Sequence, residues 1–345
     1  MKLLRIGITH GDINGIGYEL LLKVLQDPEL LDICTPVIFG SLPIAQATAH
    51  QIGIEQVPFY ITPNAEEALD GRINLIPVLA DEEAELQFGE QTEAALKAEA
   101  NSLTAALDAF HQHLIDALVT LPGHLDNDRE SHALSDFIRR ALGSQEESFD
   151  WTLNGGLRLL RLHHMDVSTQ LGEGLASEAF VAHIQSIHRS LRQDFDMIRP
   201  RIAVISAQQK LKGDLDDLRE QGITVFGPFA ADDFVKGQWQ HHYDGCLFLG
   251  EDESHDQVLA AEDSQFTIGY VSGLPLVLTY PLQGISYDIA GQGKADEVPL
   301  RQAIYAAIDI VRSRVRYHHA THHPLEKQWV PRGRDDFKLD LTKEE

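Results

Sequence analysis

The sequence is poor in cysteine and contains no long apolar segment. Cys34 and Cys246 are the only cysteines among 345 residues, and their apolar surroundings favour reduced, buried thiols over a disulfide framework. No apolar run approaches the roughly 20 residues that span a bilayer, and residues 1–9 lack the hydrophobic segment of a signal peptide. We therefore expect a cytoplasmic protein that does not bind membranes.

The chain also lacks the excess of basic residues that binding to nucleic acids requires. It carries 28 Lys and Arg against 53 Asp and Glu, which gives a formal net charge of −25. Nucleic acids and anionic membranes bind concentrated positive surfaces, so neither is an expected partner. We expect a small-molecule substrate instead. A negative field opposes the approach of a phosphorylated substrate, so Lys or Arg residues in the pocket would have to overcome it. The presence or absence of such residues therefore indicates whether the substrate carries a phosphate.

The order of apolar patterns predicts an α/β fold. With 345 residues, 43% of them hydrophobic, the chain is long enough for two domains. The strand-like run 4–9 precedes a helical pattern at 17–26, and helix 176–195 precedes strand 201–206. This alternation is typical of an α/β sheet. A last amphipathic helix is predicted over 299–316.

Four histidines stand near the C-terminal end of the sequence, at 318, 319, 322 and 323, before a charged tail. Clustered histidines can bind divalent metals. A solvated tail without a specific role is the other interpretation, and in either case the cluster would give false positives in metal-binding assays.

Two glycine-rich stretches stand out. The first, 8–17, contains Gly11, Asp12, Gly15 and Gly17 between a strand and a helix, where exposed N–H groups favour an anion. A tight turn with a purely structural role is the alternative, and the Gly-x-Gly-x-x-Gly dinucleotide fingerprint is absent.

The second stretch, 287–295, follows a strand-like run. Gly291 and Gly293 would let the backbone approach a ligand closely. The carboxylate of Asp288 could accept hydrogen bonds from hydroxyl groups.

Together, these stretches and the Gly-Leu-Pro at 273–275 resemble the 4-hydroxythreonine-4-phosphate dehydrogenase (PdxA) family over roughly residues 3–316. The resemblance implies a two-domain fold similar to isocitrate and isopropylmalate dehydrogenases, with a cleft between the domains, and a homodimer. Carried over from the family, the large α/β domain comprises 1–125 and 273–317, the second α/β domain comprises 126–272, and 318–345 form the tail.

The resemblance implies an oxidoreductase of pyridoxine biosynthesis. Such an enzyme uses NAD to oxidise the secondary alcohol of a phosphorylated hydroxy acid, such as 4-phosphooxy-threonine, and carbon dioxide is then lost. A divalent metal such as zinc or magnesium, held by three histidines, polarises the oxygen. The NAD loop of the family corresponds here to Gly284, Asp288, Gly291 and Gly293.

The three ligand positions of the family match this sequence incompletely. The first falls on His164, with His163 beside it. The second falls in a shortened loop where Lys210 is the nearest equivalent. The third reads Glu251 and Asp252, whose oxygens could hold a hard metal, while another alignment places His255 there.

Several substrate contacts of the family are also missing. Its two lysines and its arginine correspond to Gln257, Leu125 and Leu278, and Gln283 replaces the histidine before Gly284. His132 corresponds to a family histidine, which makes it a catalytic candidate together with Lys210. In another register, an intact metal site would be formed by His132, His163, His164 and His255.

These observations leave three hypotheses open. The first is a working NAD-dependent dehydrogenase with altered metal ligands and a substrate that depends less on phosphate. The second is a non-catalytic paralogue that acts as a binding or regulatory dimer. The third is a hydrolase or lyase that reuses the anion-binding turn.

Overall fold

The computed structural model describes residues 3–55, 57–79, 86–124, 133–162, 173–208, 211–250 and 254–322. The first half of the described chain contains these elements: β1 (Leu4–Thr9), α1 (Gly17–Val24), α2 (Leu30–Ile33), β2 (Cys34–Gly40), α3 (Leu42–Ile52), β3 (Tyr60–Ile61), β4 (Asn74–Pro77), α4 (Glu93–His111), β5 (Ala117–Val119), α6 (Ala133–Ala141), β6 (Phe149–Asn154) and β7 (Leu157–Leu162). The second half contains α8 (Glu173–Asp194), β8 (Ile202–Ile205), α9 (Lys212–Glu220), β9 (Val225–Phe229), α10 (Ala231–Lys236), η3 (Trp239–His242), β10 (Gly245–Leu249), α11 (Ser254–Ala260), η4 (Ser264–Phe266), β11 (Thr267–Ser272), β12 (Val277–Pro281) and α12 (Val298–His322).

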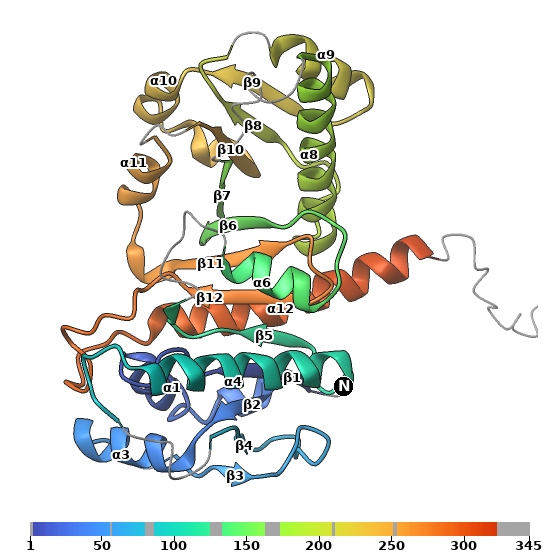
Figure 1. The fold of residues 1–345 in the computed structure, drawn as a ribbon. Helices are drawn as coiled ribbons and strands as arrows, with labels where there is room; N and C mark the ends of the chain where they lie inside the picture. The colour runs from blue at the N-terminus through green and yellow to red at the C-terminus, as the bar shows by residue number, and fades with distance from the viewer. Residues whose placement is uncertain are drawn as a thin grey trace, which may run out of the picture.

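All described strands belong to one sheet, in the order β3-β4-β2-β1-β5-β12-β11-β6-β7-β10-β8-β9. The six strands from β3 to β12 are parallel to one another, and so are the four from β7 to β9. Between these two parallel blocks, β11 and β6 run antiparallel to their neighbours. The blocks occupy opposite ends of the molecule (Figure 1).

This arrangement confirms the predicted α/β fold. Strand β2 is buried along its whole length, as expected for a parallel strand that helices cover on both faces. The chain leaves the first block after β5 and returns to it through β11 and β12. The domain boundaries at 125 and 273 lie near these crossings, and their assignment stays a prediction.

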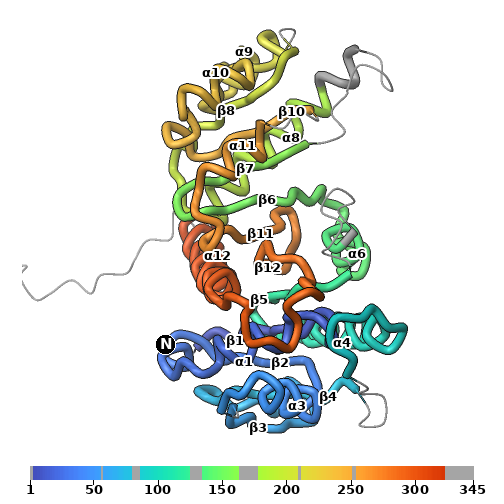
Figure 2. The backbone as a smooth tube through the Cα atoms, turned by 90° about the vertical axis from the view of Figure 1, so that its left-hand side faces the viewer, coloured from blue at the N-terminus to red at the C-terminus, as the bar shows by residue number. Residues whose placement is uncertain are grey.

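Helices cover both faces of the middle of the sheet. Figure 2 shows α12 on one side of β11 and β12, and α6 on the other. Leu134 and Ile138 of α6 pack with Leu276 and Leu278 in one apolar cluster, whereas Ala303 and Ile304 of α12 belong to another. The two clusters give the sheet an apolar core on each face.

A buried ion pair joins α12 to the second block. Nε of Arg314 lies 2.8 Å from Oδ1 of Asp194 at the end of α8, and the hydroxyl of Tyr270 donates to Oδ2 of the same carboxylate at 2.6 Å. Arg314 also donates to the carbonyls of Leu274 and Pro275 in the β11–β12 turn. This network fixes the chain at its return crossing.

Helix α12 differs from its predicted bounds. It continues to His322, because no glycine or proline interrupts residues 300–322. His318, His319 and His322 therefore lie on a helix, whereas the sequence prediction assigned them to the tail. Among the described helices, none has the length and apolar content needed to cross a membrane.

Candidate functional site

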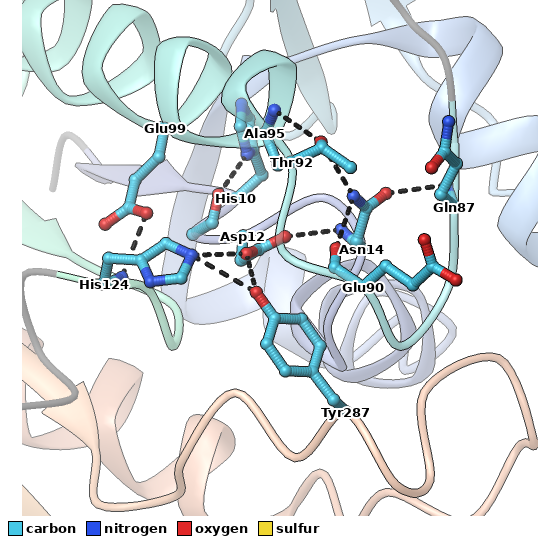
Figure 3. A network of polar contacts seen from close by, with 11 residues as sticks. His10, Asp12, Asn14, Gln87, Glu90, Thr92, Ala95, Glu99, His124 and Tyr287 are labelled. Atoms are coloured by element: carbon cyan, nitrogen blue, oxygen red, sulfur yellow. Dashed lines mark hydrogen bonds and ion pairs between the residues drawn. The ribbon is translucent and has the colours of Figure 1, made fainter.

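The glycine-rich turn and the 287–295 loop meet at one edge of the sheet. The turn follows β1, residues 120–124 follow β5, and the long loop 282–297 follows β12. These three strands are neighbours and parallel, so their carboxyl ends lie together, which is where open α/β sheets usually bind ligands. Figure 3 shows the polar network that forms there.

The carboxylate of Asp12 joins the three loops. Asp12 is fully buried, and its Oδ2 accepts a hydrogen bond of 2.5 Å from the hydroxyl of Tyr287 and lies 2.8 Å from Nε2 of His124 (Figure 3). Burial and the nearby Asp12 carboxylate raise the pKa of Tyr287. The phenol therefore stays protonated, and its O–H group donates a hydrogen bond to Asp12. The backbone N–H of His124 donates to Glu99 on α4 at 3.0 Å.

Four backbone donors of the turn are used within the protein. The N–H of Asp12 donates to the carbonyl of Pro122 at 2.9 Å, and that of Ile16 to the carbonyl of Ile285 at 3.1 Å. The N–H groups of Asn14 and Gly15 donate to Asp12 itself, to Oδ1 and to the carbonyl oxygen. The whole turn is also buried.

These contacts speak against an anion at the turn. The prediction assigned that role to Gly11, Asp12, Gly15 and Gly17, because a helix N-terminus normally exposes its N–H groups. Two of the four acceptors belong to loops far away in the sequence and two belong to Asp12 itself, and all four occupy donors that an anion would need. The contacts of the turn favour the alternative interpretation, a tight turn with a purely structural role.

Asn14 extends the network towards α4. Its Oδ1 accepts from the N–H of Gln87 at 2.8 Å, and its Nδ2 donates to the carbonyl of Glu90 and to Oγ1 of Thr92 (Figure 3). Thr92 is the N-cap of α4, because its side chain accepts from the N–H of Ala95. The turn therefore positions the start of α4 as well as the two neighbouring loops.

A partly buried ion pair on α1 holds the far end of the 282–297 loop. Glu19 is 1% exposed, and its carboxylate accepts from the N–H groups of Gly293 at 3.1 Å and Ala295 at 2.6 Å. Nζ of Lys23, one helical turn later, donates to Glu19 at 2.9 Å and to the carbonyls of Gly293 and Ala295. We call Glu19 and Lys23 the loop clamp.

The predicted NAD-binding residues lie on this clamped loop. Gly291 and Gly293 both have φ of +70°, a left-handed conformation that glycine adopts without strain. Gly284 and Asp288 are exposed, so both are accessible to a ligand. Their binding to NAD stays a prediction.

The predicted metal ligands follow three neighbouring parallel strands. Leu162 of β7 pairs with Leu249 of β10, and Phe248 of β10 pairs with Ile205 of β8, so these three strands end at the same edge of the sheet. His164, Glu251 and Asp252, together with the catalytic candidates His132 and Lys210, lie outside the described residues. Within the described ranges, no three His, Cys, Asp or Glu side chains are grouped to hold a metal.

His255 is the one predicted ligand whose surroundings the structure describes. It is 8% exposed, packs edge-on against Phe248, and places Nδ1 3.1 Å from Oδ1 of Asp256. Burial opposes ionisation of Asp256, yet hydrogen bonds from Arg161 and His255 hold its pKa below the usual value. A carboxylate on one ring nitrogen is the usual partner of a ligating histidine, so His255 fits a metal ligand that uses Nε2.

His10, just before the turn, is buried and neutral. Its ring stacks on Tyr18, its Nδ1 donates to the carbonyl of Gly11 at 2.7 Å, and Nε2 has no hydrogen-bond partner among the described residues. Burial lowers the pKa of His10 from the ordinary 6.5 to about 4.

This depressed pKa predicts a loss of stability in acid. His10 of the unfolded chain binds a proton near pH 6.5, whereas His10 of the folded protein binds one only near pH 4. The stability of the folded protein is therefore not reduced by His10 above pH 6.5, and it falls as the pH falls below that value. Over that window the loss is about 3 kcal/mol. Urea unfolding at several pH values of the wild type and of His10→Asn, whose amide can still donate to Gly11, would measure this loss. The same pH dependence in the variant as in the wild type would contradict the assignment of the loss to His10.

Local sequence patterns gave little warning of the residues that organise this site. His124 stands beside Leu125, where the family lysine is missing, and its contact with Asp12 spans 112 positions. Glu19 and Lys23 had a recognisable signal, since an acid and a base four residues apart interrupt an otherwise apolar helix.

Comparison with known proteins identifies the family. The family model described as pyridoxal phosphate biosynthetic protein PdxA matches residues 32–307. A 4-hydroxythreonine-4-phosphate dehydrogenase of Bacteroides thetaiotaomicron is 34% identical over 98% of this chain and 97% of its own length. A relative from Symbiobacterium thermophilum, whose name refers to D-threonate 4-phosphate, is 26% identical over 87% of this chain and 94% of its own length.

Solved structures agree on the fold. A 4-hydroxythreonine-4-phosphate dehydrogenase of Klebsiella pneumoniae superimposes with a TM-score of 0.71 at 19% identity, and covers 90% of this chain and 99% of its own. Because a family model covers most of the sequence and a relative of similar length is more than 30% identical to it, this chain belongs to the PdxA family.

Proposed function

We propose that this protein is an NAD-dependent dehydrogenase that oxidises and decarboxylates a hydroxy acid, with 4-phosphooxy-threonine as the first substrate to test. The observation that carries the proposal is the loop clamp, because Glu19 and Lys23 hold the far end of the 282–297 loop while Gly284 and Asp288 remain exposed. A loop ordered in advance loses less conformational entropy when a ligand binds. The full-length similarity to the Bacteroides dehydrogenase supports the same reaction.

Each part of the proposed site has its own role. When bound, NAD would accept the hydride from the substrate alcohol, and a divalent metal would polarise the alcohol oxygen. The carboxylate of Asp288 would accept hydrogen bonds from ribose hydroxyl groups. His255 would be a metal ligand through Nε2, oriented by Asp256, with His164, Glu251 and Asp252 as the remaining donors.

The substrate is proposed to differ from that of the family, because the matched cationic positions have changed. Leu278, matched to the family arginine, is fully buried in β12 and contacts no solvent. Gln257, matched to a lysine, is exposed on α11 but uncharged. We therefore propose a hydroxy acid whose binding depends less on a phosphate dianion than that of the family substrate.

The second candidate function is a non-catalytic paralogue that acts as a binding or regulatory dimer. It is favoured by the loss of cationic positions, since Leu278 and Gln257 stand where the family has an arginine and a lysine. The internal hydrogen bonds of the glycine-rich turn serve folding under either function. Under either function we propose a homodimer, and light scattering of the purified full-length chain would measure its mass.

Activity assays separate the two functions. We expect NADH formation with 4-phosphooxy-threonine or D-threonate 4-phosphate in the presence of Zn²⁺ or Mg²⁺, and its loss after chelation. The unphosphorylated acids should retain a measurable share of the rate. Saturable binding of NAD without turnover of any of these acids would favour the paralogue, and the absence of both NAD binding and turnover would overturn the dehydrogenase.

Replacing Asp288 by Ala should weaken the binding of NAD by about tenfold, the loss expected for hydrogen bonds to a charged acceptor. Calorimetric titration of NAD into the wild type and the variant would measure this change. Asp232→Ala is a suitable control, because Asp232 is also an exposed carboxylate and lies on α10, far along the chain from the loop. Equal affinities of the Asp288 variant and the wild type would remove Asp288 from the proposed site.

A further inference from the structure

The C-terminal end of α12 carries histidines that no part of the proposed reaction uses. His318, His319 and His322 are all exposed, and every residue from His318 to the end of the helix faces solvent. The helix extends here beyond the sheet that packs against its earlier turns (Figure 1). The packing of the core therefore does not determine the arrangement of these side chains.

Two of these histidines lie on one face of the helix. The rings of His318 and His322 are stacked, with centroids 4.3 Å apart and planes inclined by 23°, whereas His319 lies 6.4 Å from His318 and nearly perpendicular to it. Residues four apart are neighbours on a helix surface. Two histidines at this spacing on one helix can bind a single zinc ion, as they do in the His-Glu-x-x-His arrangement.

The local charges permit a cation at this position. The guanidinium groups of Arg314 and Arg316, one turn and half a turn before His318, are paired with Asp194 and Asp196. Their positive charge is thereby largely compensated near the histidine pair. The strongly acidic chain, with its formal net charge of −25, also raises the concentration of cations around it.

We propose that His318 and His322 chelate one divalent transition-metal ion per chain. Imidazole nitrogen favours Zn²⁺, Ni²⁺ and Cu²⁺ over Mg²⁺ and Ca²⁺, and water completes the coordination of the ion. The site is separate from the metal position of the proposed reaction and does not depend on it. Because the ion links two successive turns, it also stabilises the end of α12.

Calorimetric titration of Ni²⁺ into the full-length protein tests this proposal. His318→Ala and His322→Ala should each weaken one binding event by on the order of 100-fold, because a chelate gains its affinity from having both ligands on one scaffold. Both positions are exposed, so circular dichroism of the variants should match that of the wild type. Mg²⁺ titrated under the same conditions should show no binding that depends on these histidines.

Matched variants distinguish this pair from other sites. His319 and His323 have the same spacing in the sequence, so His319→Ala and His323→Ala are the controls and should leave the event intact. His255→Ala tests the proposed catalytic metal site separately. Unchanged Ni²⁺ binding in the His318 and His322 variants, or its loss in the His319 and His323 variants instead, would overturn the proposal.

Discussion

Replacing Glu19 by Gln should lower the free energy of unfolding by about 4 kcal/mol, within the range for breaking a buried ion pair on one side. The NH2 group of the amide would face either Lys23 and the N–H of Ala295, which share one carboxylate oxygen of Glu19, or the N–H of Gly293, and all three are donors themselves. Lys23, whose side chain is 19% exposed, would also lose its counter-charge. Urea unfolding of the wild type and the variant measures this change.

The loop itself provides a second, local measurement. The amides of Gly293 and Ala295 donate to Glu19, so their hydrogen exchange should become faster in Glu19→Gln than in the wild type. Lys23→Met should have a smaller effect on these two amides, because it leaves the carboxylate acceptor in place. Such a graded result would show that the carboxylate, more than the salt bridge, holds the loop.

The chain offers a matched control on α10. Asp232 and Lys236 have the same spacing as Glu19 and Lys23, with Nζ 3.3 Å from Oδ2, but their side chains are 85% and 75% exposed. Asp232→Asn should change stability by no more than about 0.5 kcal/mol, since exposed pairs of this kind contribute little. An equal loss in Glu19→Gln and Asp232→Asn would mean that burial gives the loop clamp no special weight.

The layout of the fold could be predicted from the sequence because its signals are local. Parallel strands buried on both faces are continuous apolar runs, so residues 4–9 are predicted as a strand, and β1 lies there. The apolar spacing of 299–316 predicts α12 but not its last residues. That last segment is exposed and polar and therefore carries no apolar period.

The polar contacts of the site could not be predicted in the same way. Glycine spacing in 8–17 suggests available N–H groups, yet their acceptors at Pro122 and Ile285 lie more than 100 positions away. The pairing of Asp12 with His124 and Tyr287 depends on the order of β1, β5 and β12 in the sheet. No local pattern reports that order.

Replacing Gly11 by Ala should also lower the free energy of unfolding by about 4 kcal/mol, the sum of a strained backbone and a steric clash. Gly11 has φ of +64°, and a Cβ there would lie 2.2 Å from the carbonyl oxygen of Pro122 and 2.6 Å from that of Leu121. Both are backbone atoms, so the turn and the loop after β5 would have to separate. The hydrogen bond from Asp12 to Pro122 and the contact of Asp12 with His124 would then be lost.

Gly71→Ala separates the two contributions. Gly71 has φ of +70°, but no described atom lies within 4 Å of the position that a Cβ would take, so its replacement should cost only about 1 kcal/mol from the backbone.

Urea unfolding of the wild type and of both variants, with and without phosphate, would also test the role of the turn. A structural turn predicts the same loss in either buffer, whereas an anion-binding turn predicts that phosphate stabilises the wild type and not Gly11→Ala.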